Sequence, residues 1–500
     1  MEFVIYCTLR EMSCKRVWFH LKSESKFLMA FLAHEGNVAM NAELLNPLPV
    51  FPTHPVSVDV VVVGAGPVGM ALAYGLRRRG VDVLLLEKAS RIVPAFKGEY
   101  VQPAGVEILK RIGLDPSGTA SSAGQVRELR FRDLDRSDDI MSDILMSYSA
   151  QSEPAVTIAH HDLIANMRRQ VIGVLGDRFW TGITIKPLGV TDRRFFNSPR
   201  LLAEHSTQGS VEIRAKYLIG CDGRGSIVRS WMKGPRVPAN AAVVTGAPRE
   251  WIIGAQLAAS APLPRRYEVL RSYTQGTVSA FSLGAQGQRL YFSSVEAAAE
   301  SGSLLNLQVD EILSRVQPHV ALGRLGPEMK LASFPAYTRW FGPSQQGHVF
   351  LAGDACGVTT PYGGQGISGG LEAVADLLEW LPTSVQNSGH WSLGFHAAET
   401  QYSFQVKKTF YRHNLIDLGI YYLFFARNPM FKSVSAHVIS SWQKNPEIAQ
   451  RVMNLFAGTD RNIPGPIELA EIWGLPLWPR WALPGFLPVN QIQKCNWSHA

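Results

Sequence analysis

Hydrophobic and polar positions between residues 58 and 86 follow the order strand, helix, strand. The segment Val58–Val63 is a β-branched run that leads into a glycine, which is typical of a fully buried parallel strand. The pattern from Met70 to Arg79 predicts a helix that ends at Gly80, and Val81–Leu86 predicts a second buried strand. Because two parallel strands need a crossover connection, these segments predict one βαβ unit.

The rest of the chain alternates between strand-like and helical patterns. From Trp180 to Ile219, alternating strands and turn residues predict an antiparallel meander. A third buried strand, His348–Ala352, precedes a glycine-rich turn and a helix from Ile367 to Trp380. Beyond about residue 390 the pattern is helical and aromatic. Two further helices are predicted earlier in the chain, Gly105–Ile112 and Asp162–Val174.

Composition indicates a globular protein and excludes several classes. The chain has 500 residues, of which 46% are hydrophobic and 18% charged, and its net charge is +8. The basic residues form short scattered clusters without interleaved aromatic residues, so we do not expect nucleic-acid binding. A mild positive charge also suits an anionic dinucleotide or the surface of an anionic membrane. The clusters are Arg77–Arg79, Arg168–Arg169, Arg193–Arg194 and Arg265–Arg266.

The cysteines and the apolar segments indicate in which cellular compartment the protein is expected. Five widely spaced cysteines without a CxxC pair predict neither a zinc site nor a disulfide framework, which favours a cytoplasmic protein. No apolar run is long enough for a membrane-spanning helix, since the longest, Leu418–Ala426, is too short. Residues 1–55 do not have the pattern of a signal peptide. They are interpreted as an N-terminal extension, or as the result of an upstream start codon with Met40 as the true first residue.

A GxGxxG motif lies between the first predicted strand and helix. Gly64 suits a tight turn, Gly66 allows the backbone to approach a pyrophosphate, and Gly69 allows the helix to pack closely on the strand. The N-terminus of the following helix then faces the phosphates. Glu87 ends the second strand, where its carboxylate would bind the ribose hydroxyls of adenosine; the alternative is a solvated acid at a strand end.

Two more motifs follow buried strands. The first, Cys221–Arg229, has Asp-Gly, Ser and Arg at fixed offsets, although Asp222 or Ser226 could equally cap a helix. The second begins with Gly353-Asp354 and continues to the glycines of residues 363–366 before a helix. Glycines there let the backbone lie against a flat or charged ligand, and the helix N-terminus favours negative charge nearby.

The order of these motifs, from about Val58 to Trp380, resembles that of the class A FAD-dependent monooxygenases of the para-hydroxybenzoate hydroxylase type. The resemblance implies that Asp222 lies near the flavin and the nicotinamide nucleotide, and that Asp354 binds the ribitol. It places Gly364–Ile367 at the pyrimidine edge of the flavin ring. The predicted cofactor contacts are Gly64, Ala65, Gly66, Pro67, Val68, Gly69, Glu87, Lys97, Asp222, Gly353, Asp354, Gly364, Gln365, Gly366 and Ile367.

Details point to particular branches of that family. The segment Lys97–Pro103 is similar to one in squalene-epoxidase-like and quinone-ring-hydroxylase-like members, with Lys97 where an arginine is usual. The pair His160-His161 also resembles squalene epoxidases; its alternative is two ordinary histidines at a turn or helix start, and no metal site is expected. Cys356 departs from the family pattern and is either a reactive thiol or, more simply, a small packed residue.

The resemblance implies an FAD enzyme that uses NADH or NADPH and O2, through a flavin C4a-hydroperoxide, to hydroxylate or epoxidise an aromatic or lipophilic small molecule. No catalytic residue is assigned. The alternatives are a flavin-dependent reductase of the geranylgeranyl-reductase type and a non-catalytic carrier on the same fold. The aromatic C-terminal region, with Tyr421–Phe425, Trp473, Trp478 and Trp481, is interpreted as a lid, as a surface for peripheral membrane contact, or as ordinary core packing.

The expected fold class is α/β, with a Rossmann-type FAD-binding domain, an inserted β-rich substrate domain and a helical C-terminal region. The FAD-binding domain is assigned to three segments and the substrate domain to two. The FAD-binding segments are 56–125, 156–235 and 341–385, the substrate segments are 126–155 and 236–340, and the C-terminal region is 386–500.

Overall fold

The computed structural model describes most of the chain between residues 52 and 474. These residues belong to one compact unit, Leu48–Ala500. Nothing is described for residues 1–51, 53, 93–98, 119–122, 135–142, 191–192, 233–249, 258–264, 273–275, 285–286, 295–313, 315–330, 387–392, 426–428 and 475–500.

The first sheet has a parallel centre built from buried, β-branched and leucine-rich strands. Within the described residues its order is β18-β19-β11-β1-β2-β8, with β10 and β9 added as antiparallel strands beside β11. Every hydrogen-bonded pair from β19 to β8 is parallel. The bounds are β1 Val56–Val63, β2 Val83–Glu87, β8 Phe179–Thr181, β9 Ile183–Pro187, β10 Arg200–His205, β11 Gly209–Gly220, β18 Gln345–Gln346 and β19 Val349–Leu351.

Helix α2, Pro67–Arg77, provides the crossover between β1 and β2. Every residue from Gly69 to Leu76 is buried, because α2 packs between α4 (His160–Leu175) and α7 (Gly366–Gln386). Helix α3, Pro103–Ile112, packs on α7 as well and ends at Gly113, whose φ of 92° suits a glycine. The first turns of α2 and α7 line the cavity described below.

The second sheet is almost wholly antiparallel, and its strands come from two distant parts of the chain. Its order is β16-β12-β15-β14-β13-β5-β6 within the described residues, and only β13 and β5 pair in parallel. The bounds are β5 Glu128–Asp133, β6 Asp143–Ser147, β12 Glu250–Leu257, β13 Arg266–Ser272, β14 Gly276–Ser282, β15 Gln288–Ser294 and β16 Leu331–Ala336.

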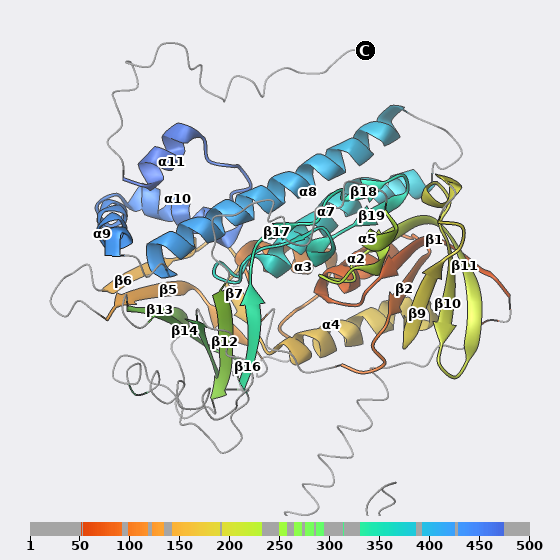
Figure 1. The fold of residues 1–500 in the computed structure, drawn as a ribbon, viewed down its shortest axis with the longest axis horizontal. Helices are drawn as coiled ribbons and strands as arrows, with labels where there is room; N and C mark the ends of the chain where they lie inside the picture. Colours follow the sequence, from red (N-terminus) through yellow and green to blue (C-terminus); the bar gives the residue numbers. More distant parts are fainter. Residues whose placement is uncertain are drawn as a thin grey trace, which may run out of the picture. The chain divides into compact units, whose positions relative to one another are not determined.

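Small sheets and C-terminal helices complete the described part. One sheet has the order β3-β7-β4, and β17 pairs with β20. The long helix α8 packs on α7 and continues into the π-helical turn η6, and Figure 1 shows it crossing the view towards α9–α11. The bounds are β3 Tyr100–Val101, β4 Gly124–Val126, β7 Ala155–Thr157, β17 Arg339–Trp340, β20 Gly357–Val358, α8 Leu393–Ile420, η6 Tyr421–Phe425, α9 Pro429–Lys444, α10 Pro446–Ala457 and α11 Pro466–Ile472.

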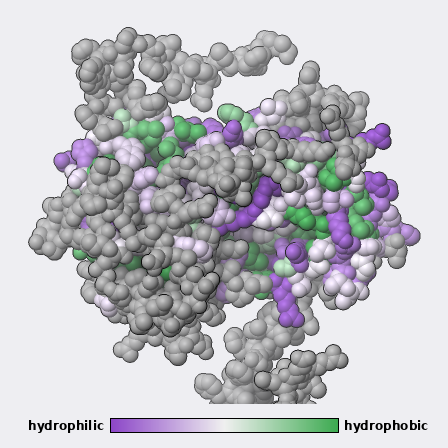
Figure 2. All heavy atoms as spheres, in the orientation of Figure 1, coloured by the Kyte–Doolittle hydropathy of each residue, from purple (hydrophilic) through white to green (hydrophobic). Residues whose placement is uncertain are grey.

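The surface mixes polar and apolar side chains. Figure 2 shows hydrophilic and hydrophobic residues interspersed over the face in view, with a hydrophobic group at the upper left, over the C-terminal helices. Among the described helices, none combines the length and the apolar character needed to cross a bilayer.

The predicted α/β fold class is confirmed, and the differences lie at element ends and in the pairing of β8. Helix α2 begins at Pro67, three residues before the predicted start, because proline is well suited to the first helical position. It ends at Arg77, two residues early. The predicted meander holds for β9, β10 and β11, but β8 instead pairs in parallel with β2.

Candidate active site

The glycine loop after β1 is fixed by close backbone contacts. Gly64 has a φ of 99°, and a Cβ there would lie 2.5 Å from the carbonyl oxygen of Cys221. A Cβ on Gly69 would lie 1.9 Å from the Gly64 carbonyl oxygen, so the first turn of α2 can approach the loop only with glycine. At Gly66, by contrast, a Cβ would meet nothing within 4 Å. The loop therefore leaves open space at the N-terminus of α2, where a pyrophosphate would bind.

The carboxylate of Glu87 holds this loop to the end of β2. Its Oε2 accepts a hydrogen bond from the Ala65 N–H at 2.7 Å, and its Oε1 accepts one from the Ala89 N–H at 2.7 Å. The side chain is half-buried at the strand end. Glu87 therefore has a structural role here in addition to the ribose contact that the sequence predicts.

The Asp222 carboxylate lies at the start of helix α5, Ile227–Trp231. Its Oδ2 accepts hydrogen bonds from the N–H groups of Ile227 at 2.6 Å and Val228 at 3.3 Å. Ser226 caps the same helix by accepting from the Arg229 N–H at 3.0 Å. The helix-capping alternative is thus realised by both side chains, and the predicted flavin contact of Asp222 stays a prediction.

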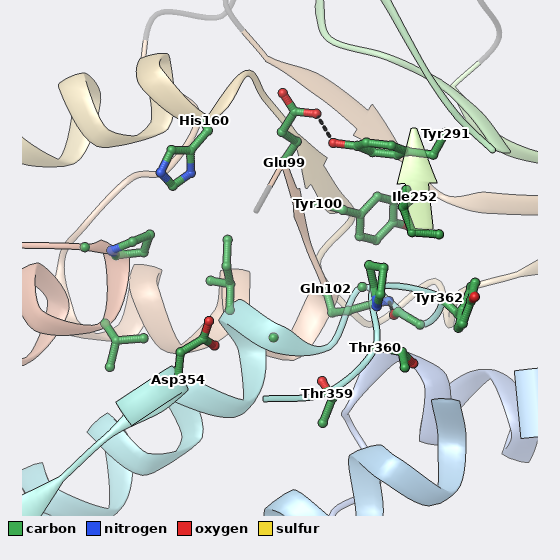
Figure 3. A pocket seen from close by; sticks show the side chains of 18 of the residues that line it. Glu99, Tyr100, Gln102, His160, Ile252, Tyr291, Asp354, Thr359, Thr360 and Tyr362 are labelled. Atoms are coloured by element: carbon green, nitrogen blue, oxygen red, sulfur yellow. Dashed lines mark hydrogen bonds between the residues drawn. The ribbon is translucent and has the colours of Figure 1, made fainter. Parts of the chain in front are cut away.

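The Gly353-Asp354 turn packs against the first turn of α2. A Cβ on Gly353, whose φ is 62°, would lie 3.1 Å from Cγ2 of Val68. Asp354 is directed into the cavity described below (Figure 3), and its Oδ2 lies 3.4 Å from Nε of Arg224. Cys356 is buried, and its thiol donates to the Leu351 carbonyl. Because burial raises the pKa of this thiol, Cys356 suits the packed role better than the reactive one.

The loop before α7 is held by a buried carboxyl group on α8. Asp417 accepts hydrogen bonds from the Thr360 hydroxyl at 3.0 Å and the Gly363 N–H at 3.1 Å. Burial raises the pKa of Asp417 to about 8, although these donors oppose the shift. Gly364 has a φ of 61°, and a Cβ on Gly366 would meet nothing within 4 Å. The open side of this loop is the N-terminus of α7.

The Gln365 side chain points away from that open side. Its Nε2 donates to the carbonyl oxygens of Phe456 at 2.7 Å and Gly363 at 3.2 Å, and the side chain is fully buried. Because both partners are acceptors, the amide orientation follows from the hydrogen bonds. Gln365 therefore connects the loop to the C-terminal end of α10, where helix carbonyls lack intrahelical donors.

A cavity of about 300 Å³ joins the motifs to the second sheet. One wall is formed by the glycine loop, Asp354 and the start of α7. The opposite wall comes from the second sheet and includes Tyr267, Phe281 and Tyr291. Figure 3 shows Asp354 on the first side and Glu99, Tyr100 and Tyr291 on the other. Seven predicted contacts line it: Gly66, Pro67, Val68, Asp354, Gly364, Gly366 and Ile367.

The remaining predicted contacts stand behind the wall or outside the described residues. Seven of them are in the described part of the chain but do not line the cavity. Six of these form turns, packing contacts or hydrogen bonds, and the seventh, Ala65, is buried. Lys97 lies outside the described residues. The contacts that do not line the cavity are Gly64, Ala65, Gly69, Glu87, Asp222, Gly353 and Gln365.

A buried ion pair lies at the end of the cavity that the second sheet forms. Nε and Nη2 of Arg289 donate to Oε2 and Oε1 of Glu99 at 2.7 and 2.6 Å, and both side chains are at most 2% exposed. The Tyr291 hydroxyl donates to the same carboxylate at 2.6 Å (Figure 3). Burial, followed by the Glu99 charge, raises the pKa of Tyr291, so this hydroxyl keeps its proton. The pair fixes Tyr291 at the cavity wall.

A second chain of hydrogen bonds reaches the loop before α7. The hydroxyls of Tyr100 and Tyr148 are 2.9 Å apart, and Tyr148 donates to Oε1 of Gln102 at 2.8 Å. Nε2 of Gln102 donates to the Gly363 carbonyl at 2.7 Å. Burial raises the pKa values of both tyrosines, so the chain is neutral over the ordinary pH range.

Sequence reasoning did not assign these supporting residues a role in the site. Glu99 and Gln102 lie within the segment that resembles squalene-epoxidase-like proteins, which was the available signal. Arg289 carried a weaker signal, as a charged residue within an otherwise strand-like segment. Asp417 and Phe456 carried none, because helical periodicity does not reveal which distant loop a buried side chain contacts.

The residues present fit FAD. Two helix N-termini, those of α2 and α7, open into the cavity at glycines where a Cβ would meet nothing within 4 Å. Helix N-termini favour a pyrophosphate and the negative charge of a reduced flavin. The Asp354 carboxylate, between these two helices in the cavity wall, can accept hydrogen bonds from ribitol hydroxyls.

Comparison with known proteins agrees with this geometry. A curated relative, the 12-dehydrotetracycline 5-monooxygenase/anhydrotetracycline 6-monooxygenase of Streptomyces rimosus, is 27% identical over 341 residues, 64% of this chain and 61% of that protein. This chain thus spans about three fifths of that relative. Squalene epoxidase of Saccharomyces cerevisiae is 21% identical over 473 residues, 84% of this chain and 87% of that protein. With the FAD-binding family match given below, these relatives confirm the resemblance to FAD-dependent monooxygenases.

A solved structure shows the same fold. That of p-nitrophenol 4-monooxygenase from Pseudomonas putida superposes with a TM-score of 0.64 at 18% identity, covering 85% of this chain and all of that one (100%). The family model described as "FAD binding domain" matches residues 57–393, well over half of the chain. This protein therefore belongs to the FAD binding domain family.

Proposed function

We propose that this protein is an FAD-dependent monooxygenase that uses NADH or NADPH and O2 to hydroxylate or epoxidise an aromatic or lipophilic small molecule. One observation carries the proposal: the FAD motifs and the apolar side chains of the second sheet line the same cavity. A substrate held there would contact the flavin directly, as oxygen transfer requires. The names of the relatives support the same activity.

The cofactor is held by the first wall and by Glu87, which is hydrogen-bonded to the glycine loop. The N-terminus of α2 binds the pyrophosphate, Glu87 the adenosine ribose, Asp354 the ribitol, and the start of α7 the pyrimidine edge. When bound and reduced, FAD supplies the activation of O2. The positive end of the α7 dipole at Gly366 and Ile367 stabilises negative charge at that edge.

The substrate is positioned by the second wall. The rings of Tyr267 and Phe281 are stacked, with centroids 5.3 Å apart, and Tyr100 meets both edge-on. Such a wall packs against aromatic rings and alkenes and excludes water. The pKa of Tyr267 is raised to about 12 by burial, so its hydroxyl remains a neutral hydrogen-bonding group.

Arginines near Asp354 support the use of a nicotinamide nucleotide. Arg224 lines the cavity, with 41% of its side chain exposed, and its guanidinium lies 5.6 Å from the ring of Tyr337. Arg229 donates to the carbonyls of Ala355 at 2.8 Å and Arg224 at 2.7 Å. These cations attract an anionic dinucleotide to the side of the cavity where the flavin binds.

The test is oxygen incorporation by the purified flavoprotein. A panel of phenols, naphthols and isoprenoid alkenes is incubated with NADPH or NADH under ¹⁸O₂, and product mass is measured. We expect FAD absorbance, substrate-stimulated oxidation of NAD(P)H, and one ¹⁸O atom in the product. Saturation of a substrate double bond without oxygen uptake would instead indicate the reductase, and a protein that does not bind FAD would indicate the carrier.

Two further proposals concern organisation and location. We propose the segment boundaries given under Sequence analysis as the domain boundaries of the chain, with the second sheet as the substrate domain. The protein is proposed to be cytoplasmic. Peripheral membrane contact has no support beyond the aromatic composition of the C-terminal region, of which Trp478 and Trp481 lie outside the described residues.

A further inference from the structure

A second cavity, of about 160 Å³, lies between the second sheet and the C-terminal helices. Strands β5 and β6 form one side, and α8, η6, α9, α10 and α11 contribute the rest. Typical lining residues are Leu129, Phe131, Ile416, Leu423, Trp442 and Ile472. We call this cavity the apolar chamber.

The Arg412 guanidinium and the Trp442 indole N–H at the apolar chamber have hydrogen-bond partners, although Nε of Arg412 has none in the described structure. Arg412 is the only charged residue among those that line it in the described part of the chain. Its guanidinium donates to Glu372 and lies 2.8 Å from Nε2 of His413. The indole N–H of Trp442 donates to the Ile472 carbonyl at 2.6 Å. The chamber therefore offers an occupant apolar surface and no unpaired charge.

Phe456, near the C-terminal end of α10, lines both the apolar chamber and the cavity that holds the FAD motifs. Its carbonyl accepts the hydrogen bond from Gln365, in the loop before α7. Its ring is stacked on that of Tyr148, with centroids 6.3 Å apart and an interplanar angle of 14°. Tyr148 is held by Gln102, which also binds this loop. Phe456 is therefore fixed from two sides at the boundary between the cavities.

We propose that the apolar chamber is a second substrate subsite, which receives the apolar chain of a molecule whose reactive ring or alkene lies beside the flavin, and that Phe456 controls passage between the two. The proposal rests on the monooxygenase function and names its substrate class: a ring or alkene with a linear hydrocarbon extension. The two cavities share Phe456 as a wall residue, and this adjacency and the apolar lining favour this occupant.

Gly419 on α8 provides a way to fill the apolar chamber without touching the flavin side. It lines the chamber but not the first cavity, and a Cβ there would meet nothing within 4 Å. Replacing a helical glycine also favours the helix. Gly173 is the matched control, because it lies on the exposed face of α4 and also has open space at Cβ.

The experiment measures binding of 4-alkylphenols, from methyl to nonyl, to the FAD-loaded protein by the change in flavin absorption. In the wild type we expect affinity to rise about fourfold per added methylene until the apolar chamber is full. Gly419→Phe should abolish this gain and leave the affinity for 4-methylphenol unchanged, whereas Gly173→Phe should match the wild type. An equal chain-length gain in the wild type and Gly419→Phe overturns the proposal.

A second variant tests the boundary and does not depend on the folding of Gly419→Phe. The wild type should bind linear 4-octylphenol more tightly than 4-tert-octylphenol, because the branched chain does not pass Phe456. In Phe456→Ala this preference should shrink by about tenfold, and an unchanged preference counts against the role of Phe456.

The two proposals fail in different ways. Oxygenated product together with affinities that do not depend on chain length would leave the monooxygenase function standing and remove the subsite. A clear chain-length gain that Gly419→Phe abolishes, without oxygenated product from any probe, would keep the subsite and remove the function.

Discussion

Arg289 donates two parallel hydrogen bonds to Glu99 across 190 residues of sequence, and both side chains are almost completely buried. Because removal of one partner leaves an uncompensated buried charge, Arg289→Met should lower the free energy of unfolding by about 3–5 kcal/mol. The double variant Glu99→Leu/Arg289→Met should lose less free energy of unfolding than Arg289→Met alone. Urea unfolding, followed by fluorescence, compares the three proteins.

The control for this comparison is an exposed pair. In Arg200→Ala the ion pair with Glu212 is lost, but half of the Arg200 side chain is exposed, at 50%. Its unfolding midpoint should therefore stay close to that of the wild type. If Arg289→Met is as stable as Arg200→Ala, the buried pair is not the support of the cavity wall that we describe.

Two glycines of the same loop should respond differently to alanine. Gly66→Ala should leave apo-protein stability unchanged, because a Cβ meets nothing within 4 Å and the extended backbone there suits alanine. It should weaken FAD binding about tenfold, or about 1.4 kcal/mol, by occupying the pyrophosphate space. FAD retention after gel filtration and thermal unfolding of the apo-protein measure the two effects.

Gly69→Ala should instead destabilise the fold itself. Its Cβ would lie 1.9 Å from the Gly64 carbonyl oxygen, so strand and helix must separate. We expect a loss of about 1–3 kcal/mol in the apo-protein. Equal apo-protein stability of the two variants would contradict the division of roles within the loop.

Asp417 should make stability depend on pH. Its pKa is raised from 3.8 to about 8, chiefly by burial. The folded protein holds this proton more tightly than the unfolded chain. The stabilisation that Asp417 contributes is therefore complete below pH 3.8 and is lost as the pH rises through about 8. Asp417→Asn removes this dependence and retains an acceptor for the Gly363 N–H.

The measurement is the urea midpoint of both proteins between about pH 6 and about pH 9. Over this range the wild type should lose about 2–3 kcal/mol relative to Asp417→Asn. A parallel pH dependence of the two proteins would show that Asp417 is ionised at neutral pH, contrary to its burial.

Arg224 should matter for the nicotinamide nucleotide more than for FAD. Arg224→Ala is expected to raise KM for NADPH or NADH about fivefold, a modest change because the side chain is 41% exposed and screened by salt. FAD content should remain that of the wild type. Steady-state kinetics at two salt concentrations tests this. An unchanged KM would show that Arg224 does not contribute to binding of the nicotinamide nucleotide.

Local sequence signals predicted the elements that place the cofactor. The β-branched run before Gly64 and the order of the motifs were sufficient to predict the parallel sheet. A buried strand, a glycine turn and a helix N-terminus are each determined by neighbouring residues. The family assignment followed from the same segments. The segment around Asp222 shows the limit of such signals, since the same residues also satisfy a helix cap.

The supporting contacts depend on long-range pairing, which no local pattern contains. The family resemblance assigned Gln365 to the cofactor, yet its amide reaches Phe456, 91 residues later. Asp417 directly precedes the apolar run Leu418–Ala426, and only tertiary packing brings it to Gly363. The alternation of β13 likewise gave no sign that its parallel neighbour is β5.

That parallel contact has a consequence for biosynthesis. Arg266 of β13 pairs with Glu128 of β5, and β11 cannot complete the first sheet until Val349–Leu351 of β19 has left the ribosome. The two sheets are thus interleaved in sequence, because all strands of the second sheet lie between segments of the first, and β8–β11 lie between the two segments of the second. Such contacts of high sequence separation are slow to form. We expect nascent chains that end before β19 to remain bound to chaperones, and no fragment containing only one sheet to fold alone.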